Sequence, residues 1–284
     1  MHLALSPRLP VPPAPIELID LPHPALPEAL DGLTILHISD LHARRDLTAT
    51  DRWKAILHAL AITPADLVVV TGDLMDEPGH EQAALATMHA LASRWRPRFG
   101  AFAVLGNHDS PALAQRLHEI KGLTTLGVNA PAHFDLSIPH SPTPVTLRLL
   151  GLNAPEDPLG VLLSAPPIPA DQPSFTLALA HHPTVLIAAA DLHLPLVLAG
   201  HTHAGQIRLH PRLAPHTSSD LPPHLASGML RLRSTLCCIS RGIGDGVVEG
   251  LRINCPAQIP LYTLRSAPLP PTRDPEAVAQ VVPW

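Results

Sequence analysis

Short apolar runs rich in Val, Ile, Leu and Thr alternate along the chain with longer stretches whose apolar positions recur every three to four residues. The short runs predict buried strands and the longer stretches predict amphipathic helices. This alternation is typical of βαβ units, in which helices connect parallel strands. The predicted strands are residues 34–39, 66–71, 101–106, 176–180 and 194–199.

Two stretches carry a clear helical stripe. In residues 51–62 it consists of Trp53, Ile56, Leu57 and Leu60, and in residues 81–95 of Leu85, Met88, Leu91, Ala92 and Trp95. Because each stripe covers one side of a helix, we interpret both as core faces rather than as binding grooves.

The second half of the chain has a different pattern. Residues 124–176 lack a helical stripe and contain a strand and turn at 146–153. Two further strands are predicted, at 229–240 and in LRINC (251–255), on either side of a glycine-rich turn, RGIGDG (241–246). These features predict a second, more antiparallel sheet region. The proline-rich stretch 155–173 predicts an exposed loop.

Proline is dense near both ends of the sequence, in residues 7–27 and 267–283. Each proline fixes φ and removes a backbone donor, which favours extended segments over packed helices. We therefore expect a proline-rich N-terminal arm over 1–30, one large domain over 31–265 and a proline-rich C-terminal tail over 266–284.

Composition narrows the class of protein. With 284 residues and 46% hydrophobic content the chain can bury a large core, and 3% aromatic content makes that core aliphatic. The net charge is −5, so the protein lacks the positive surface potential that attracts nucleic acid. We therefore exclude nucleic acid as a partner. Three cysteines and no apolar run long enough to span a bilayer predict a cytoplasmic protein in a reducing compartment.

A polar cluster follows each of the five predicted strands. Taken singly, each cluster is compatible with a helix N-cap or a turn. Because the carboxyl ends of strands in an α/β sheet meet in one crevice, we expect all five clusters to converge on one site. Their members are Asp40 and His42, Asp73, Asn107 with His108 and Asp109, His181 and His182, and His201 and His203.

The converging side chains offer carboxylate, amide and imidazole groups without a thiolate, and they outnumber the ligands of a single zinc ion. Two divalent cations about 3.5–4 Å apart, bridged by a carboxylate, fit this set better. Such a pair serves displacement at phosphorus, so the sequence predicts a phosphoester hydrolase. A single-metal hydrolase of the metallo-β-lactamase type requires an H-x-H-x-D-H cluster, and the sequence HTHAGQ (201–206) does not supply it.

The motifs SDLH, GDL, GNHD, H-x-P and GHTH, in this order over residues 35–205, resemble the calcineurin-like metallophosphoesterase superfamily. The similarity is greatest to a branch of bacterial phosphohydrolases with an HTHGGQ-like final motif, a glycine turn and an Arg-x-x-x-P segment, here RINCP from Arg252. Ala204 replaces a glycine of that branch. The resemblance implies an α/β fold, an α/β/β/α sandwich of two mixed sheets flanked by helices.

The resemblance also implies a role for each matching residue. Asp109 would orient the ring of the catalytic residue His108. His182 is interpreted as a structural loop residue, and Asp76 and Glu77 as capping or solvating the next segment. Arg44 and Arg45 are either substrate contacts or solvated surface residues. The implied ligands are Asp40, His42 and His203 for one metal, Asp73 as the bridge, and Asn107, His181 and His201 for the other.

The resemblance implies two divalent cofactors, Mn, Fe or Zn, and hydrolysis of a phosphodiester or pyrophosphate by a hydroxide bound between them. The expected partner is a phosphorylated small-molecule or lipid-linked substrate, with UDP-2,3-diacylglucosamine of lipid A synthesis placed first and peripheral contact with the inner membrane allowed. One alternative is a phosphomonoesterase or nucleotide phosphodiesterase acting on a soluble substrate. Another is a non-catalytic phosphate-binding scaffold, against which the complete ligand set and His108 argue.

Overall fold

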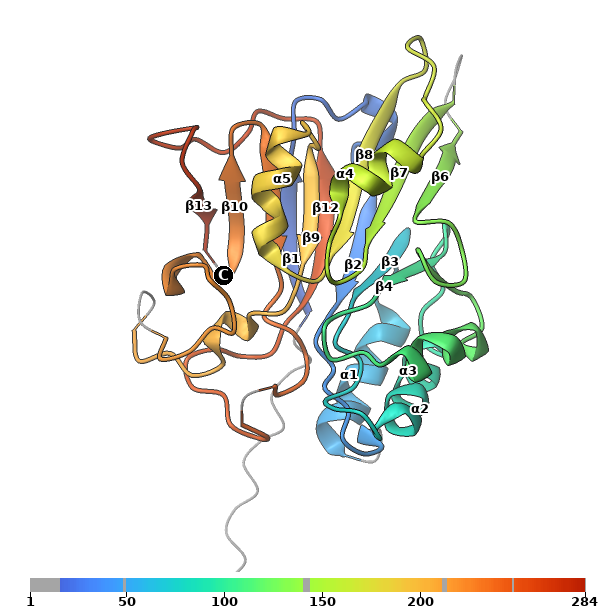
Figure 1. The fold of residues 1–284 in the computed structure, drawn as a ribbon, viewed down its shortest axis with the longest axis vertical. Coiled ribbons are helices and arrows are strands. Elements are labelled where there is room, and N and C mark those ends of the chain that lie inside the picture. Colours follow the sequence, from blue (N-terminus) through green and yellow to red (C-terminus); the bar gives the residue numbers. More distant parts are fainter. Residues whose placement is uncertain (1–15, 48–49, 140–143, 211–213, 247, 284) are drawn as a thin grey trace, which may run out of the picture.

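Two mixed β-sheets pack face to face, and α-helices cover their outer faces (Figure 1). The computed structural model describes residues 16–47, 50–139, 144–210, 214–246 and 248–283. The arrangement confirms the α/β fold with two mixed sheets flanked by helices that the sequence predicts.

The first sheet has the strand order β1-β12-β2-β3-β4-β5, and its neighbouring strands run parallel except for the antiparallel pair β12/β2. Three helices belong to this half, α1 (Asp51–Ile62), α2 (Glu81–Ala92) and α3 (Pro111–Arg116). The strands are β1 (Ile16–Pro22), β2 (Thr34–Ile38), β3 (Leu67–Thr71), β4 (Ala101–Val104), β5 (Leu123–Thr125) and β12 (Ile259–Arg265).

The second sheet has the order β13-β10-β11-β9-β8-β7-β6, parallel from β11 to β7 and antiparallel at both edges. Two helices belong to this half, α4 (Pro158–Ser164) and α5 (Leu186–Asp191). The strands are β6 (His133–Ile138), β7 (Val145–Leu152), β8 (Ser174–Ala180), β9 (Leu196–Ala199), β10 (Gly228–Leu232), β11 (Thr235–Ile239) and β13 (Ala279–Val282).

Three apolar clusters fill the three interfaces of the sandwich. Strand β3 contributes to two of them because successive side chains of a strand point to opposite faces. Leu67 and Val69 belong to the cluster between the sheets, whereas Val68 and Val70 pack with the helical residues Trp53 and Leu85. A third cluster joins the second sheet to α5. The strands are therefore buried on both faces, which explains their continuous apolar sequences.

The five strands predicted from apolar runs and the helix over 51–62 are confirmed. The helix predicted over 81–95 ends earlier, at Ala92. The strand predicted for LRINC is wrong, because only Ile253 forms an isolated bridge there and the strand of this region is β12. The loop predicted over 155–173 is interrupted by α4, which Asp157 caps through a hydrogen bond from Gly160 N.

Parts of both proline-rich segments take part in the sheets. Strand β1, within the arm expected over 1–30, pairs with β12, and β13, within the tail expected over 266–284, pairs with β10. Residues 1–15 and 284 lie outside the described residues. In the described part of the chain, none of the helices combines the length and the apolar character that crossing a membrane requires.

Candidate metal centre

All seven predicted metal ligands lie where the carboxyl ends of β2, β3 and β4 meet those of β8 and β9, at the lower ends of these strands in Figure 1. Asp73 is central, since its Oδ2 lies 3.0 Å from His181 Nε2 and 3.5 Å from His42 Nε2. Asp40 Oδ1 lies 3.5 Å from His203 Nε2. Residues from both sheets thus form one cluster.

A second group of imidazoles adjoins this cluster. His201 Nδ1 lies 3.1 Å from His181 Nε2, and His182 Nε2 lies 3.1 Å from Asn107 Oδ1. The backbone N–H of His201 donates to Asp40 Oδ1 at 2.9 Å, which connects the two groups. The predicted convergence of the five strand-end clusters is therefore observed.

Five of the predicted ligands have a backbone conformation that non-glycine residues rarely adopt. The values of φ are 55° at Asp40, 43° at His42, 53° at Asp73, 74° at His201 and 48° at His203. Positive φ at a non-glycine residue costs conformational energy and tends to occur at functional sites. The chain turns sharply at these points and thereby aims the side chains into the cluster.

Glycines allow the chain segments to approach the site. A Cβ atom on Gly72 would lie 2.3 Å from Gly106 N, so these two turns touch through their backbones. A Cβ atom on Gly246 would lie 2.6 Å from His203 Nε2 and 2.9 Å from His42 Nε2. The glycine-rich turn over 241–246 therefore covers the ligand nitrogens directly.

The chemistry of this cluster fits divalent cations. A cavity of about 40 Å³ is lined by Asp73 and by the imidazoles of His42, His108, His201 and His203. Asp40 Oδ2 and His203 Nδ1 are buried and have no hydrogen-bond partner among the residues that the structure describes. Nitrogen and oxygen donors without thiolate suit Mn, Fe and Zn. The buried Asp40 oxygen is an acceptor without a donor in the described part of the chain, and a cation would supply the partner that it lacks.

Charges within the cluster shift its pKa values. Burial lowers the pKa of His181, but Asp73 and Asp40 outweigh it and raise that pKa to about 10. Burial, together with His181 and His182, lowers the pKa of His201 to about 4. The pKa of Asp73 is lowered because His181 and His42 outweigh the effect of burial. Asp73 is therefore ionised and His201 neutral, as a cation ligand requires. His181 is protonated beside the two carboxylates, and it would release this proton when a cation binds.

Asp76 holds one of the ligands in place. Its Oδ1 lies 3.2 Å from His42 Nδ1, while Arg44 donates to the same carboxylate from Nε at 2.7 Å and from Nη2 at 2.9 Å. Burial raises the pKa of Asp76, but His42 and Arg44 outweigh it and lower the pKa to about 2. The prediction that Asp76 caps or solvates the next segment is wrong, because its carboxylate faces back toward the site.

Asp109 does not have the contacts of a residue that orients the His108 ring. Its carboxylate accepts hydrogen bonds from the backbone N–H groups of Leu74 at 2.7 Å and Gly106 at 2.8 Å. The Nδ1 atom of His108 instead contacts the carbonyl of Asp76. The orienting role predicted for Asp109 is therefore corrected, since this carboxylate ties together the turns after β3 and β4.

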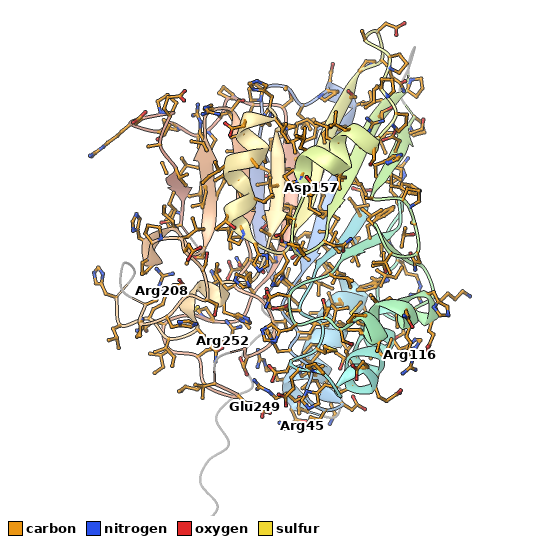
Figure 2. The ribbon with its side chains drawn as sticks, viewed as in Figure 1. Arg45, Arg116, Asp157, Arg208, Glu249 and Arg252 are labelled. Carbon is orange, nitrogen blue, oxygen red and sulfur yellow. The ribbon has the colours of Figure 1, made fainter. Side chains whose placement is uncertain are left out.

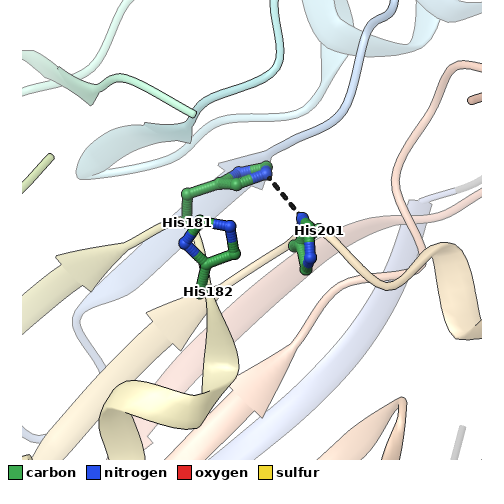
Figure 3. Close-up of side chains that lie close together, drawn as sticks. All are labelled: His181, His182 and His201. Carbon is green, nitrogen blue, oxygen red and sulfur yellow. Dashed lines mark hydrogen bonds between the residues drawn. The ribbon is translucent and has the colours of Figure 1, made fainter. Parts of the chain in front are cut away.

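His182, interpreted from the sequence as a structural loop residue, lies with His181 and His201 at the site (Figure 3). Its Nδ1 lies 2.9 Å from both carboxylate oxygens of Glu156. Sequence reasoning assigned no role to Glu156, because nothing in its neighbourhood along the chain connects it to a histidine 26 positions later.

Arg252, of the segment RINCP, lies below the strands and holds the glycine-rich turn over the site (Figure 2). It pairs with Asp245 Oδ1 at 3.0 Å and donates from Nη2 to the carbonyls of Arg241 at 3.1 Å and Gly242 at 3.3 Å. The glycine-rich turn is also bonded to the loop that follows β2, because the Gly244 N–H donates to the carbonyl oxygen of Asp40 at 2.7 Å. This arginine therefore stabilises the wall of the site.

The chain is similar to several known proteins. The chain is similar to "Uncharacterized metallophosphoesterase YkuE" of Bacillus subtilis (strain 168), with 28% identity over 85% of this chain and 82% of the relative. It is similar to "Phosphodiesterase YaeI" of Escherichia coli (strain K12), with 25% identity over 81% of each chain. Among solved structures, phosphopantetheinyl hydrolase from Mycobacterium tuberculosis matches 61% of this chain and 83% of that one, with 15% identity and a TM-score of 0.33.

The family model for calcineurin-like phosphoesterases matches residues 33–205, which include every strand-end cluster described above. The chain belongs to the calcineurin-like phosphoesterase family, whose members are dinuclear metal-dependent hydrolases of phosphoric esters.

Proposed function

We propose that the protein hydrolyses a phosphodiester with two divalent cations, Mn, Fe or Zn. The observation that carries this proposal is the convergence of ligand-type side chains from five strand ends at one small cavity and the histidine group beside it. The proposed ligands are Asp40, His42 and His203 for one cation, Asp73 between the two, and Asn107, His181 and His201 for the other.

The bound cations would polarise phosphoryl oxygens and activate water for attack at phosphorus. The protein would supply the proton chemistry through His108. Because a carbonyl oxygen can only accept, the contact of His108 Nδ1 with the carbonyl of Asp76 places the ring proton on Nδ1. This leaves Nε2 to act on the phosphoryl group or on the leaving oxygen. The ring packs edge-on against His42, with centroids 4.8 Å apart, and so stays at the cluster.

A larger cavity beside His201 and His182 supports a substrate with a polar group next to the phosphate. Its volume is about 700 Å³, and its wall includes His216, Ser219 and Asp220. A phosphodiester is placed first because the similar YaeI protein is named a phosphodiesterase. A lipid-linked pyrophosphate such as UDP-2,3-diacylglucosamine remains a test substrate, since its polar head suits this lining.

The test is hydrolysis of bis(p-nitrophenyl) phosphate by metal-stripped protein with manganese added back. His108→Ala is expected to lower kcat by about 10²–10⁴-fold while two cations remain bound. His118→Ala, which replaces an exposed histidine outside the site, serves as the control. The monoester p-nitrophenyl phosphate and UDP-2,3-diacylglucosamine, assayed alongside, rank the substrate classes. Absence of turnover together with absence of bound cations would contradict the proposal.

A further inference from the structure

His182 reaches the cluster because the chain changes direction directly after β8. In a continuing strand the side chains of His181 and His182 would point to opposite faces. Instead a short 3-10 turn begins at Pro183. The ring of His182 consequently lies 5.1 Å from that of His181 and 4.2 Å from that of His201, measured between centroids (Figure 3).

Glu156 determines which nitrogen of His182 is available. The carboxylate lies 2.9 Å from His182 Nδ1 and also accepts the backbone N–H of His182 at 2.9 Å. An ionised carboxylate can only accept hydrogen bonds, so Nδ1 carries a ring hydrogen, and in the neutral ring Nε2 then presents its lone pair. Histidines that bind a metal through one ring nitrogen usually donate the N–H of the other ring nitrogen to a carboxylate or a similar acceptor.

The free nitrogen faces the cluster. His182 Nε2 lies 3.1 Å from Asn107 Oδ1, and the three imidazoles of His181, His182 and His201 place one ligand atom each within 4.8 Å of one another. Two acceptor atoms at 3.1 Å repel unless a positive group lies beside both. A cation satisfies both atoms. A second proton on His182, or an N–H of the Asn107 amide turned toward His182, would satisfy them without a cation, and the metal titrations below separate these arrangements from cation binding.

We propose that His182 is an additional imidazole ligand of the cation held by Asn107, His181 and His201, with Glu156 as its positioning residue. This inference rests on the proposed function, because it requires that cations bind at the site. It adds a third imidazole to that cation, and imidazole ligands suit Zn, Fe and Cu, whereas Mg and Mn prefer oxygen ligands. The site formed by Asn107, His181, His182 and His201 is accordingly expected to favour Zn or Fe over Mn.

The direct test places a thiolate at the proposed ligand position. His182→Cys, stripped of metal and titrated with Co²⁺, is expected to show a thiolate-to-cobalt charge-transfer band in the near ultraviolet as the cation binds. The matched control is His216→Cys, which lines the same large cavity outside the histidine cluster and is expected to show no band. The wild-type protein, titrated in the same way, provides the baseline for its own three cysteines.

Metal affinity gives a second readout that does not depend on catalysis. His182→Ala is expected to weaken one of the two Zn²⁺ sites by tenfold or more, and Glu156→Gln by about 10–100-fold, measured by competition with a chromogenic chelator. Circular dichroism verifies that each variant is folded.

The absence of the band in folded His182→Cys would overturn the ligand role, even if His182→Ala weakened binding. Wild-type affinity of both sites in His182→Ala would overturn it as well. In either case the proposed function stands, because the wild-type protein still binds two cations. A wild-type protein that binds no Co²⁺ or Zn²⁺ would instead overturn the proposed function together with this inference.

Discussion

The Nε2 atoms of His42 and His203 face each other at 2.9 Å, although the two residues come from different sheets. Both rings are buried, and burial and the nearby His42 lower the pKa of His203 well below its usual value. When both Nε2 atoms carry lone pairs, as ligation of a metal requires, they repel each other at this distance. A cation beside them satisfies both, so the two histidines are better partnered when metal is bound.

Removal of metal is therefore expected to destabilise the folded protein as well as to abolish turnover. A ligand present at 100 times its Kd stabilises the native state by about 2.7 kcal/mol. Calorimetric melting of chelator-treated protein, before and after manganese is restored, measures this difference. An identical Tm in both states would mean that the cluster binds no cation in the folded protein.

Gly246→Ala is expected to displace the rings of His42 and His203, since the added methyl would lie within 3 Å of both Nε2 atoms. We expect at least a tenfold loss of cation affinity, measured by metal titration. Gly250→Ala is the matched control on the same loop, where a Cβ atom meets open space and only the positive φ of 74° is strained. If both variants bind cations like the wild-type protein, the turn does not pack on the ligands as described.

Asp109→Asn tests the corrected role of this carboxylate. Replacing one oxygen by an NH₂ group leaves Leu74 N or Gly106 N without its acceptor, which is expected to cost about 1–3 kcal/mol of unfolding free energy. Urea denaturation measures the loss. The pH profile of kcat is expected to keep its shape, because the ring of His108 is held by Asp76. A shifted profile with unchanged stability would restore the orienting role.

His37 makes the stability of the fold depend on pH. Its pKa is lowered by burial from about 6.5 to about 3, so the folded protein keeps it neutral while the unfolded chain binds a proton below pH 6.5. Stability is therefore lost as the pH falls through 6.5, and at pH 5 the loss is about 2 kcal/mol. In His37→Leu, the difference in unfolding free energy between pH 7.5 and pH 5, measured in chelator, is expected to shrink by this amount. An equal pH dependence of both proteins would contradict the buried neutral state.

The order of apolar runs was sufficient to predict the main strands and the edge where the site forms, whereas the two-sheet sandwich was implied by the family resemblance. Strand β3 illustrates why: both of its faces are buried, so Leu67–Val70 is apolar throughout and the first polar residues mark the strand end. The strand prediction for LRINC failed because its apolar side chains Leu251 and Ile253, which are 40% and 39% exposed, lie in an irregular segment and not on the buried face of a sheet.

The supporting residues of the site were not predictable in the same way. Asp76 and Glu156 act on histidines that are 34 and 26 positions away, and no local pattern encodes such distances. The H-x-P motif selects His181 and leaves His182 as a structural residue, and nothing in the sequence indicates that the turn at Pro183 brings the His182 ring to the cluster. The location of residues at strand ends can be predicted from the topology of the sheets. The residues that orient them, such as Asp76 and Glu156, can be identified only in the folded structure.

The two layers of the sandwich share the cluster described above, with Asp73 contributed by one sheet and His181 by the other. A bound cation at this junction would act as a crosslink that joins the layers without a covalent bond. Backbone amides at the carboxyl ends of β3 and β8, although they belong to separate hydrogen-bonded sheets, would then gain protection from exchange with solvent together when metal binds.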